Sequence, residues 1–183
     1  FTTSDSDLVK LLDPLSEDRN TLRQSLAVSL YRIYEYNKAR NNKDVSIFEM
    51  GKVFEKVGEE YKETMKLGAL MTGEYYLGLN KKQVNFYMIK GVAEEILDYL
   101  GYNGRYSFVQ DENKLPKEMH PGQSAVISVN NDAVGIIGKV HPRVTKDDVY
   151  ILEIDLDKLL AKKVGKMKYK EISKFPTIKK DLA

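Results

Sequence analysis

The run from Thr21 to Val57 constrains the fold most, because it predicts a helix followed directly by a long strand. Leu26, Leu30 and Ile33 recur at spacings of four and three, with Tyr34 beside them, which is the period of an amphipathic helix. From residue 45 the composition becomes dense in β-branched and aromatic residues, which favour strands. The chain therefore has to combine helix and sheet.

The ends of this helix and one position in the strand are marked by specific residue types. Ser25 is placed to cap the helix by accepting from free backbone N–H groups, and Thr21 with Gln24 offers an alternative capping box. Residues 41–43 end the helix in a loop. Gly51, inside the strand, predicts either a bulge or a close approach of the backbone.

Two further helices are expected in the remaining sequence. Residues 86–100 carry apolar side chains at steps of three and four, with Gly101 as the C-terminal cap. A shorter helix is expected at 156–163, capped by Asp155. Polar and irregular composition predicts loops at 74–83 and 111–118.

The other strands follow one another in hairpins. Turns are expected at 58–60 and at 130–132, where Asn and Asp tolerate a positive φ. Strands after the first are expected at residues 61–72, 106–109, 125–129, 133–140 and 150–154. Tandem hairpins, without one helix per strand, predict an α+β fold in which helices flank an antiparallel sheet.

Composition narrows the class of protein. The chain has 183 residues, 42% of them hydrophobic, which suits one globular domain. Its 29 basic and 27 acidic residues give a net charge of +2, which argues against a surface built mainly for nucleic acid. The absence of cysteine excludes disulfides and thiolate zinc sites. With no apolar run near the ~20 residues that span a bilayer, we expect a cytoplasmic location and no membrane partner.

Several short pieces, in order, resemble one family. Asp13 opens the first piece, Asp-Pro-Leu-Ser-Glu-Asp-Arg, which is followed by Leu-Arg-Gln-Ser-Leu at 22–26 and Ile-Phe-Glu-Met-Gly-Lys-Val-Phe at 47–54. The later pieces are 86–91, 120–125, 135–142 and 172–183. Together they are similar to the synthetase-like domain in the beta subunit of bacterial phenylalanyl-tRNA synthetases. Three features depart from that family: Asp13 replaces a usual Asn, Gln24 replaces a common Thr, and no Trp precedes Phe86.

The resemblance implies a class II aminoacyl-tRNA synthetase-like domain within a heterotetrameric ligase. In that enzyme the alpha subunit would use ATP and Mg²⁺ to activate phenylalanine and charge tRNA, while this domain would dock on alpha and touch the tRNA little. Residues 1–14 would lead in from a preceding domain and 15–170 would form the core. Residues 171–183 would begin the linker to a ferredoxin-like anticodon-binding domain, so the tail from Lys174 is expected to pack poorly alone.

The resemblance also implies that the domain is inactive and has no catalytic, cofactor-binding or metal-binding residues. Catalytic relatives carry Phe-Arg-x-Glu on the strand matching Phe54 to Val57, and the arginine binds the α-phosphate of ATP. Here Glu55 and Val57 replace the arginine and the glutamate, so a phosphate would meet a like charge. No Glu-Arg pair, which holds the rest of ATP in those relatives, occurs in the chain. The alternative is a free-standing class II-like enzyme or nucleotide-binding domain.

Other candidate chemistry has simpler structural explanations. His120 and His141, each followed by Pro, are more typical of turns than of a zinc site. Gly135 and Gly138 lack the helix and the Gly-Lys-Ser/Thr ending of a phosphate loop, so they indicate bulges or close packing.

Acidic and basic residues near the end of the sequence are also ambiguous. Glu153 and Asp155 share one strand face, as an acid–base pair would, but a capping role is favoured for Asp155. The lysines at 162, 163, 166, 168 and 170 could touch RNA, although a solvated face is the simpler explanation.

The helix from Ser25 to Arg40 is the expected contact with the alpha subunit. The candidate interface residues are Arg23, Tyr31, Tyr34 and Tyr36. The three tyrosines face different directions, so they cannot all lie in the core, and tyrosine is a common interface anchor.

Overall fold

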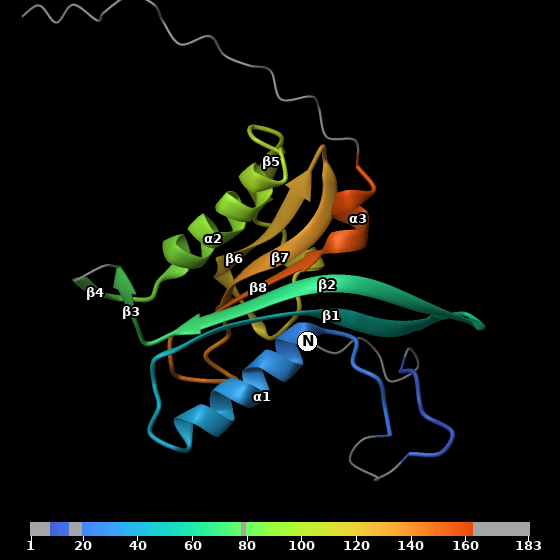
Figure 1. Cartoon of the computed structure of the whole chain (residues 1–183), viewed down its shortest axis with the longest axis horizontal. Coiled ribbons are helices and arrows are strands. Elements are labelled where there is room, and N and C mark those ends of the chain that lie inside the picture. The colour runs from blue at the N-terminus through green and yellow to red at the C-terminus, as the bar shows by residue number, and fades with distance from the viewer. Residues whose placement is uncertain (1–7, 15–19, 78–79, 163–183) are drawn as a thin grey trace, which may run out of the picture.

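A six-stranded antiparallel sheet forms the centre of the computed structural model, which describes residues 8–14, 20–77 and 80–162 (Figure 1). Its strand order is β1-β2-β8-β7-β6-β5, and every neighbouring pair is antiparallel. The strands are β1 (Val45–Val57), β2 (Glu60–Thr72), β5 (Tyr106–Val109), β6 (Met119–Val129), β7 (Asp132–Val140) and β8 (Val149–Asp155). The predicted α+β architecture is confirmed.

Three helices of the described residues cover the two faces of this sheet. Figure 1 shows α1 (Leu26–Lys38) on one face, opposite α2 (Phe86–Tyr99) and α3 (Leu156–Leu160). α1 contacts β1, β2 and β8, whereas α2 contacts β7 and β8. Each face therefore has its own apolar core, and the larger one lies under α2 and α3.

Helix α1 buries a slightly different face from the predicted one. Ala27, Leu30 and Tyr34 are buried together with Leu26, whereas Ile33 is 43% exposed. The stripe that meets the sheet therefore runs through 27, 30 and 34, and Ile33 falls at its rim.

The helix caps are the predicted ones. Ser25 caps α1 by accepting from the Ala27 backbone N–H at 3.1 Å, so the Thr21–Gln24 alternative is not the cap. Gly101, with φ of 85°, follows α2, and Asp155 accepts from the Lys158 N–H at 2.8 Å to cap α3. These helix ends could be predicted from the sequence because each capping residue lies within a few residues of the helix end that it caps.

The hairpin turns also follow the sequence. Gly58 has φ of 65° between β1 and β2. Asn130 and Asn131 have φ of 52° and 68° between β6 and β7. Strand β6 begins at Met119, earlier than predicted, and its pairing with β7 shifts between Met119 and Ser124.

Residues 74–83 are not the predicted loop. They form a small hairpin of β3 (Glu74–Leu77) and β4 (Asn80–Gln83), which projects from the sheet in Figure 1. Asp44 accepts from the Glu74 N–H at 2.8 Å and Lys81 pairs with Glu74. Most described side chains of this hairpin are exposed, so its sequence needs no alternation of apolar and polar residues. The other predicted loop, 111–118, contains one 3-10 turn, Glu112–Lys114.

Before α1, residues 9–11 pair with residues 20–22, which lead into the helix. Leu22 N–H donates to the Val9 carbonyl at 2.9 Å and Leu11 N–H to the Asn20 carbonyl at 2.8 Å. The predicted boundaries after residues 14 and 170 remain predictions, and the tail from Lys174 lies outside the described residues. Within the described part of the chain, no helix is long and apolar enough to cross a membrane.

Gly135 and Gly91 offer a matched test of close packing. An added Cβ at Gly135 would overlap the carbonyl oxygen of Glu153, whereas one at Gly91, in α2, would meet nothing within 4 Å. We expect Gly135→Ala to lower the free energy of unfolding by about 1–3 kcal/mol and Gly91→Ala to raise it by about 0.5–1 kcal/mol. Urea titration measures both. Equal effects would show that β7 and β8 do not approach as closely as described.

Candidate functional site

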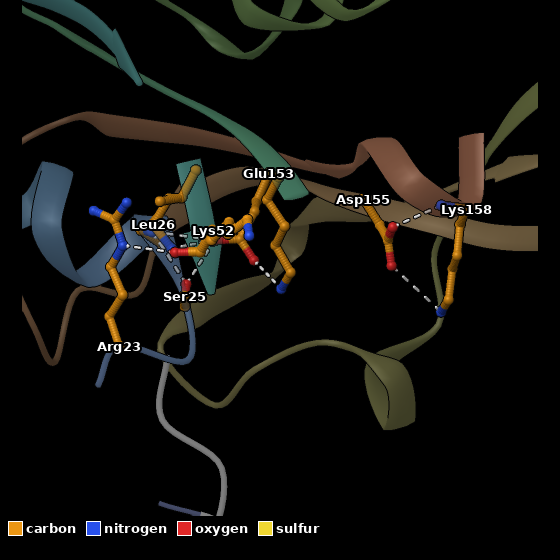
Figure 2. A network of polar contacts seen from close by, with 9 residues as sticks. Arg23, Ser25, Leu26, Lys52, Glu153, Asp155 and Lys158 are labelled. Carbon is orange, nitrogen blue, oxygen red and sulfur yellow. Dashed lines mark hydrogen bonds and ion pairs between the residues drawn. The ribbon is translucent and has the colours of Figure 1, made fainter. Parts of the chain in front are cut away.

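The most heavily bonded buried side chain on the α1 face of the sheet is Glu153. It lies in the middle of β8, is 5% exposed and points toward the start of α1 (Figure 2). One carboxylate oxygen accepts from the Ser25 hydroxyl at 2.7 Å and from the backbone N–H groups of Leu26 and Ala27 at 2.7 and 3.1 Å. The other accepts from the Lys66 ammonium at 2.7 Å.

Electrostatics explain why a carboxylate is stable in this buried position. The first N–H groups of a helix have no partner within the helix, and the helix dipole places partial positive charge there. Glu153 supplies the missing acceptor, and Lys66 on β2 balances its charge. The arrangement joins the start of α1 to the two central strands β2 and β8.

Glu153 therefore has a structural role that the sequence did not reveal. Its spacing from Asp155 suggested a possible acid–base pair, but each of the two carboxylates binds the start of a different helix. Ser25, which Glu153 binds, is 128 residues away, and no local pattern connects positions so far apart.

A cleft of about 290 Å³ opens beside this network, over the part of the sheet that α1 leaves free. Its charged groups pair with one another: Lys66 with Glu153 at 2.7 Å, and Lys158 with Asp155 at 3.9 Å. Lys114, also in the lining, pairs with Asp111. Among the described residues, no buried side-chain polar atom lacks a hydrogen bond.

Glu55 lies on β1 directly opposite Lys62 of β2. The two side chains form an ion pair at 3.2 Å and both are substantially exposed. A carboxylate therefore occupies the position where the resemblance places a phosphate-binding arginine, and its nearest cation is already paired with it.

The two histidines lie side by side, with ring centroids 6.0 Å apart. The Nδ1 of His120 accepts from the Gly122 N–H, and that of His141 from the Arg143 N–H, each at 3.0 Å. The Nδ1 atoms of both rings are thus occupied by the chain's own backbone. His141 precedes a turn at 142–144, as predicted, whereas His120 lies in the irregular first part of β6.

The structure places the candidate interface tyrosines in three different environments. Tyr34 is 2% exposed and its hydroxyl donates to Asp147. Tyr31 is half-buried beside it, with ring centroids 5.4 Å apart. Tyr36 is 59% exposed, with the Arg40 guanidinium 3.3 Å from its ring centroid. Tyr34 thus belongs to the core, and Tyr36 is the most accessible of the three.

Ion pairing shifts the pKa of Asp147, the partner of Tyr34. Lys38 binds this carboxylate at 2.6 Å, and together with the Tyr34 hydroxyl it holds the pKa of Asp147 below its ordinary value. Burial and the Asp147 bond raise the pKa of Tyr34. These contacts fix the C-terminal half of α1 to the loop before β8.

The fourth candidate, Arg23, lies against its own fold. Its side chain donates to the Lys52 carbonyl at 3.0 Å, pairs with Glu49 and crosses β1 at Gly51 (Figure 2). The register of β1 with β2 is continuous through Gly51. A bulge is therefore wrong, and the group that lies close to Gly51 is the Arg23 side chain, not another backbone.

Comparison with known proteins gives the family. Residues 1–156 match the family described as phenylalanyl tRNA synthetase beta chain CLM domain. The chain belongs to this family. It is 34% identical to the phenylalanine–tRNA ligase beta subunit of Staphylococcus haemolyticus over its whole length, and 37% identical to that of Bacillus subtilis over 93% of it. It spans only 23% and 22% of those two relatives.

Replacement of Glu153 tests its role in this CLM domain. Glu153→Gln keeps the size of the side chain but leaves Lys66 without its partner and places an NH₂ group near the N–H donors of α1. We expect the free energy of unfolding to fall by about 2–4 kcal/mol in urea titrations.

Glu63→Gln is the matched control. Glu63 pairs with Lys52 at 2.5 Å, but both side chains are more than half exposed, so water replaces the lost contact and little measurable loss is expected. Equal losses in the two variants would contradict a special role for Glu153.

Proposed function

We propose that this chain is a non-catalytic, class II synthetase-like domain that supports the catalytic alpha subunit of a phenylalanine–tRNA ligase. Family membership supports the link to phenylalanine–tRNA ligase beta subunits. The observation that most supports a non-catalytic role is the position of Glu153 at the start of α1.

Helix N-termini bind phosphates when their backbone N–H groups are free. Here the protein's own carboxylate accepts from the Leu26 and Ala27 N–H groups, and its charge would repel a phosphate. Glu55 adds a second negative charge where catalytic relatives place an arginine. Both features disfavour ATP binding to this domain.

The domain's contribution would be assembly. Docked on alpha, it would hold the catalytic subunit in its working geometry, while alpha binds ATP, Mg²⁺ and phenylalanine. The tRNA would contact mainly other parts of a heterotetrameric, cytoplasmic enzyme. A near-neutral net charge of +2 supports this limited role in RNA binding.

The first test is nucleotide binding. We expect calorimetric titration with ATP and Mg²⁺ to show no binding and pyrophosphate exchange to show no phenylalanine-dependent signal. Loss of one charge-assisted hydrogen bond costs about 1.5–3 kcal/mol, roughly a tenfold to hundredfold loss of affinity, before the repulsion by Glu55 is counted. Glu55→Arg with Val57→Glu should also fail, because Glu153 still fills the start of α1.

Micromolar ATP binding by the unmodified chain would favour the alternative, a free-standing class II-like enzyme or nucleotide-binding domain. Phenylalanine-dependent exchange would do the same.

The second test is assembly with the alpha subunit. We expect this chain and alpha to co-elute in size exclusion, with Tyr36→Ala and Tyr31→Ala each weakening the complex by more than about 1 kcal/mol. Tyr34→Ala should instead lower the stability of the chain alone, by about 3–5 kcal/mol, because its ring is buried. Unchanged assembly in the Tyr31 and Tyr36 variants would exclude α1 as the contact.

A further inference from the structure

One strip of the sheet, on the face that α2 and α3 occupy elsewhere, remains open to solvent. On β1, Phe48 is 79% exposed and Met50 is 65% exposed. Ala69 and Leu67 of β2 lie directly opposite them and share their face. Ala69 is buried and Leu67 partly buried, because both pack in the core under α2 and α3. Phe48 and Met50 therefore define what we call the open strip.

The neighbouring helices stop short of the open strip. α2 contacts β7 and β8, and α3 contacts β2, β7 and β8. In Figure 1, α2 lies over the part of the sheet far from β1, and α1 lies on the opposite face. On β2, the side chains of Met65 and Leu67 pack against the core beneath α2 and α3 but are only partly buried.

The dimensions of the open strip suit a helix. A helix is about 10 Å across and adjacent strands are about 4.8 Å apart, so a helix laid along β1 would cover Phe48 and Met50 and reach the partly buried Leu67 of β2. The charged pair on this face, Lys52 and Glu63, is already joined at 2.5 Å. The surface is thus apolar and locally neutral, which fits an apolar protein surface better than a polyanion.

The length of the relatives indicates where such a helix would come from. This chain spans 22–23% of the beta subunits that it matches, so most of their polypeptide lies outside the matching segment. Soluble proteins seldom leave adjacent large apolar side chains uncovered on an edge strand.

We propose that, in the longer beta-subunit polypeptide, an amphipathic helix from outside these residues packs on the open strip. Its apolar stripe, with aliphatic or aromatic side chains at intervals of three and four, lies along β1 and covers Phe48 and Met50. The helix completes the layer that α2 and α3 begin, and so joins this domain to the rest of its own polypeptide.

The test measures how fast hydrogen peroxide oxidises Met50 in two contexts. One is the 183-residue chain; the other is the Bacillus subtilis beta subunit with its matching segment replaced by this chain, without alpha. We expect oxidation of Met50 to be at least about tenfold slower in the long polypeptide, because a packed thioether reacts only when its cover opens. Met119, which is buried, should react slowly in both and so report that the graft is folded.

Each other outcome contradicts the proposal. Equal oxidation of Met50 in both contexts shows that no helix of the polypeptide covers the strip. Protection that appears only when alpha is added assigns the strip to the partner subunit. Protection of the short chain that rises with its concentration assigns it to a second copy.

A second measurement needs only the isolated chain. An open apolar strip should bind the dye anilinonaphthalene sulfonate, and Phe48→Ser with Met50→Ser should reduce the fluorescence at least about twofold while the melting temperature changes little. Tyr99→Ser, on α2 and also highly exposed, is the control and should leave the fluorescence unchanged. If the double variant leaves the fluorescence unchanged, the strip is not an open apolar surface and the proposal fails.

Discussion

The carboxylate of Glu153 is the contact on which the arrangement of α1 and the sheet depends. It accepts from the first N–H groups of the helix while Lys66 on the neighbouring strand balances its charge. A buried carboxylate with fewer donors would favour protonation or exposure. Because the donors come from α1 and from β2, the helix can start at only one place on the sheet. Position and orientation of α1 are thereby set together.

The same contact supports the proposal that this domain is non-catalytic. A helix N-terminus can bind a phosphate when its N–H groups are free, whereas the first N–H groups of α1 are already bound by Glu153. On the hairpin of β1 and β2, Glu55 is likewise paired within the domain, with Lys62. The charged groups at the start of α1 and at Glu55 are thus paired within the domain.

Much of the fold was predictable because its signals are local. The cap at Ser25, the turn at Asn130 and the glycine after α2 act through neighbours within a few residues, so the sequence displays them directly. The hairpin at 74–83 was missed because most of its described side chains are exposed, so no apolar period marks its strands. Ile33 was predicted to be buried but is exposed, because the period of apolar residues shows which face of α1 is apolar but not how wide the buried part of that face is.

The candidate site was less predictable, since its contacts cross more than a hundred residues. Ser25 was correctly identified as a cap, but nothing near it pointed to Glu153. Of the three tyrosines expected to face different ways, Tyr36 does point to solvent, but Tyr31 and Tyr34 lie side by side. The buried Tyr34 donates to Asp147, in a distant loop that no local pattern near the helix indicates.

The hairpin of β1 and β2 is longer than the sheet that supports it. Residues 66–72 of β2 pair with β8, but residues 60–65 pair only with β1, so the outer half is a two-stranded ribbon that extends beyond the sheet (Figure 1). Such ribbons have low local stability. Amide hydrogens should therefore exchange faster along the ribbon than in the inner half of the same strand. Glu55 lies on this ribbon, so any ligand bound there would rest on the less stable half of the hairpin.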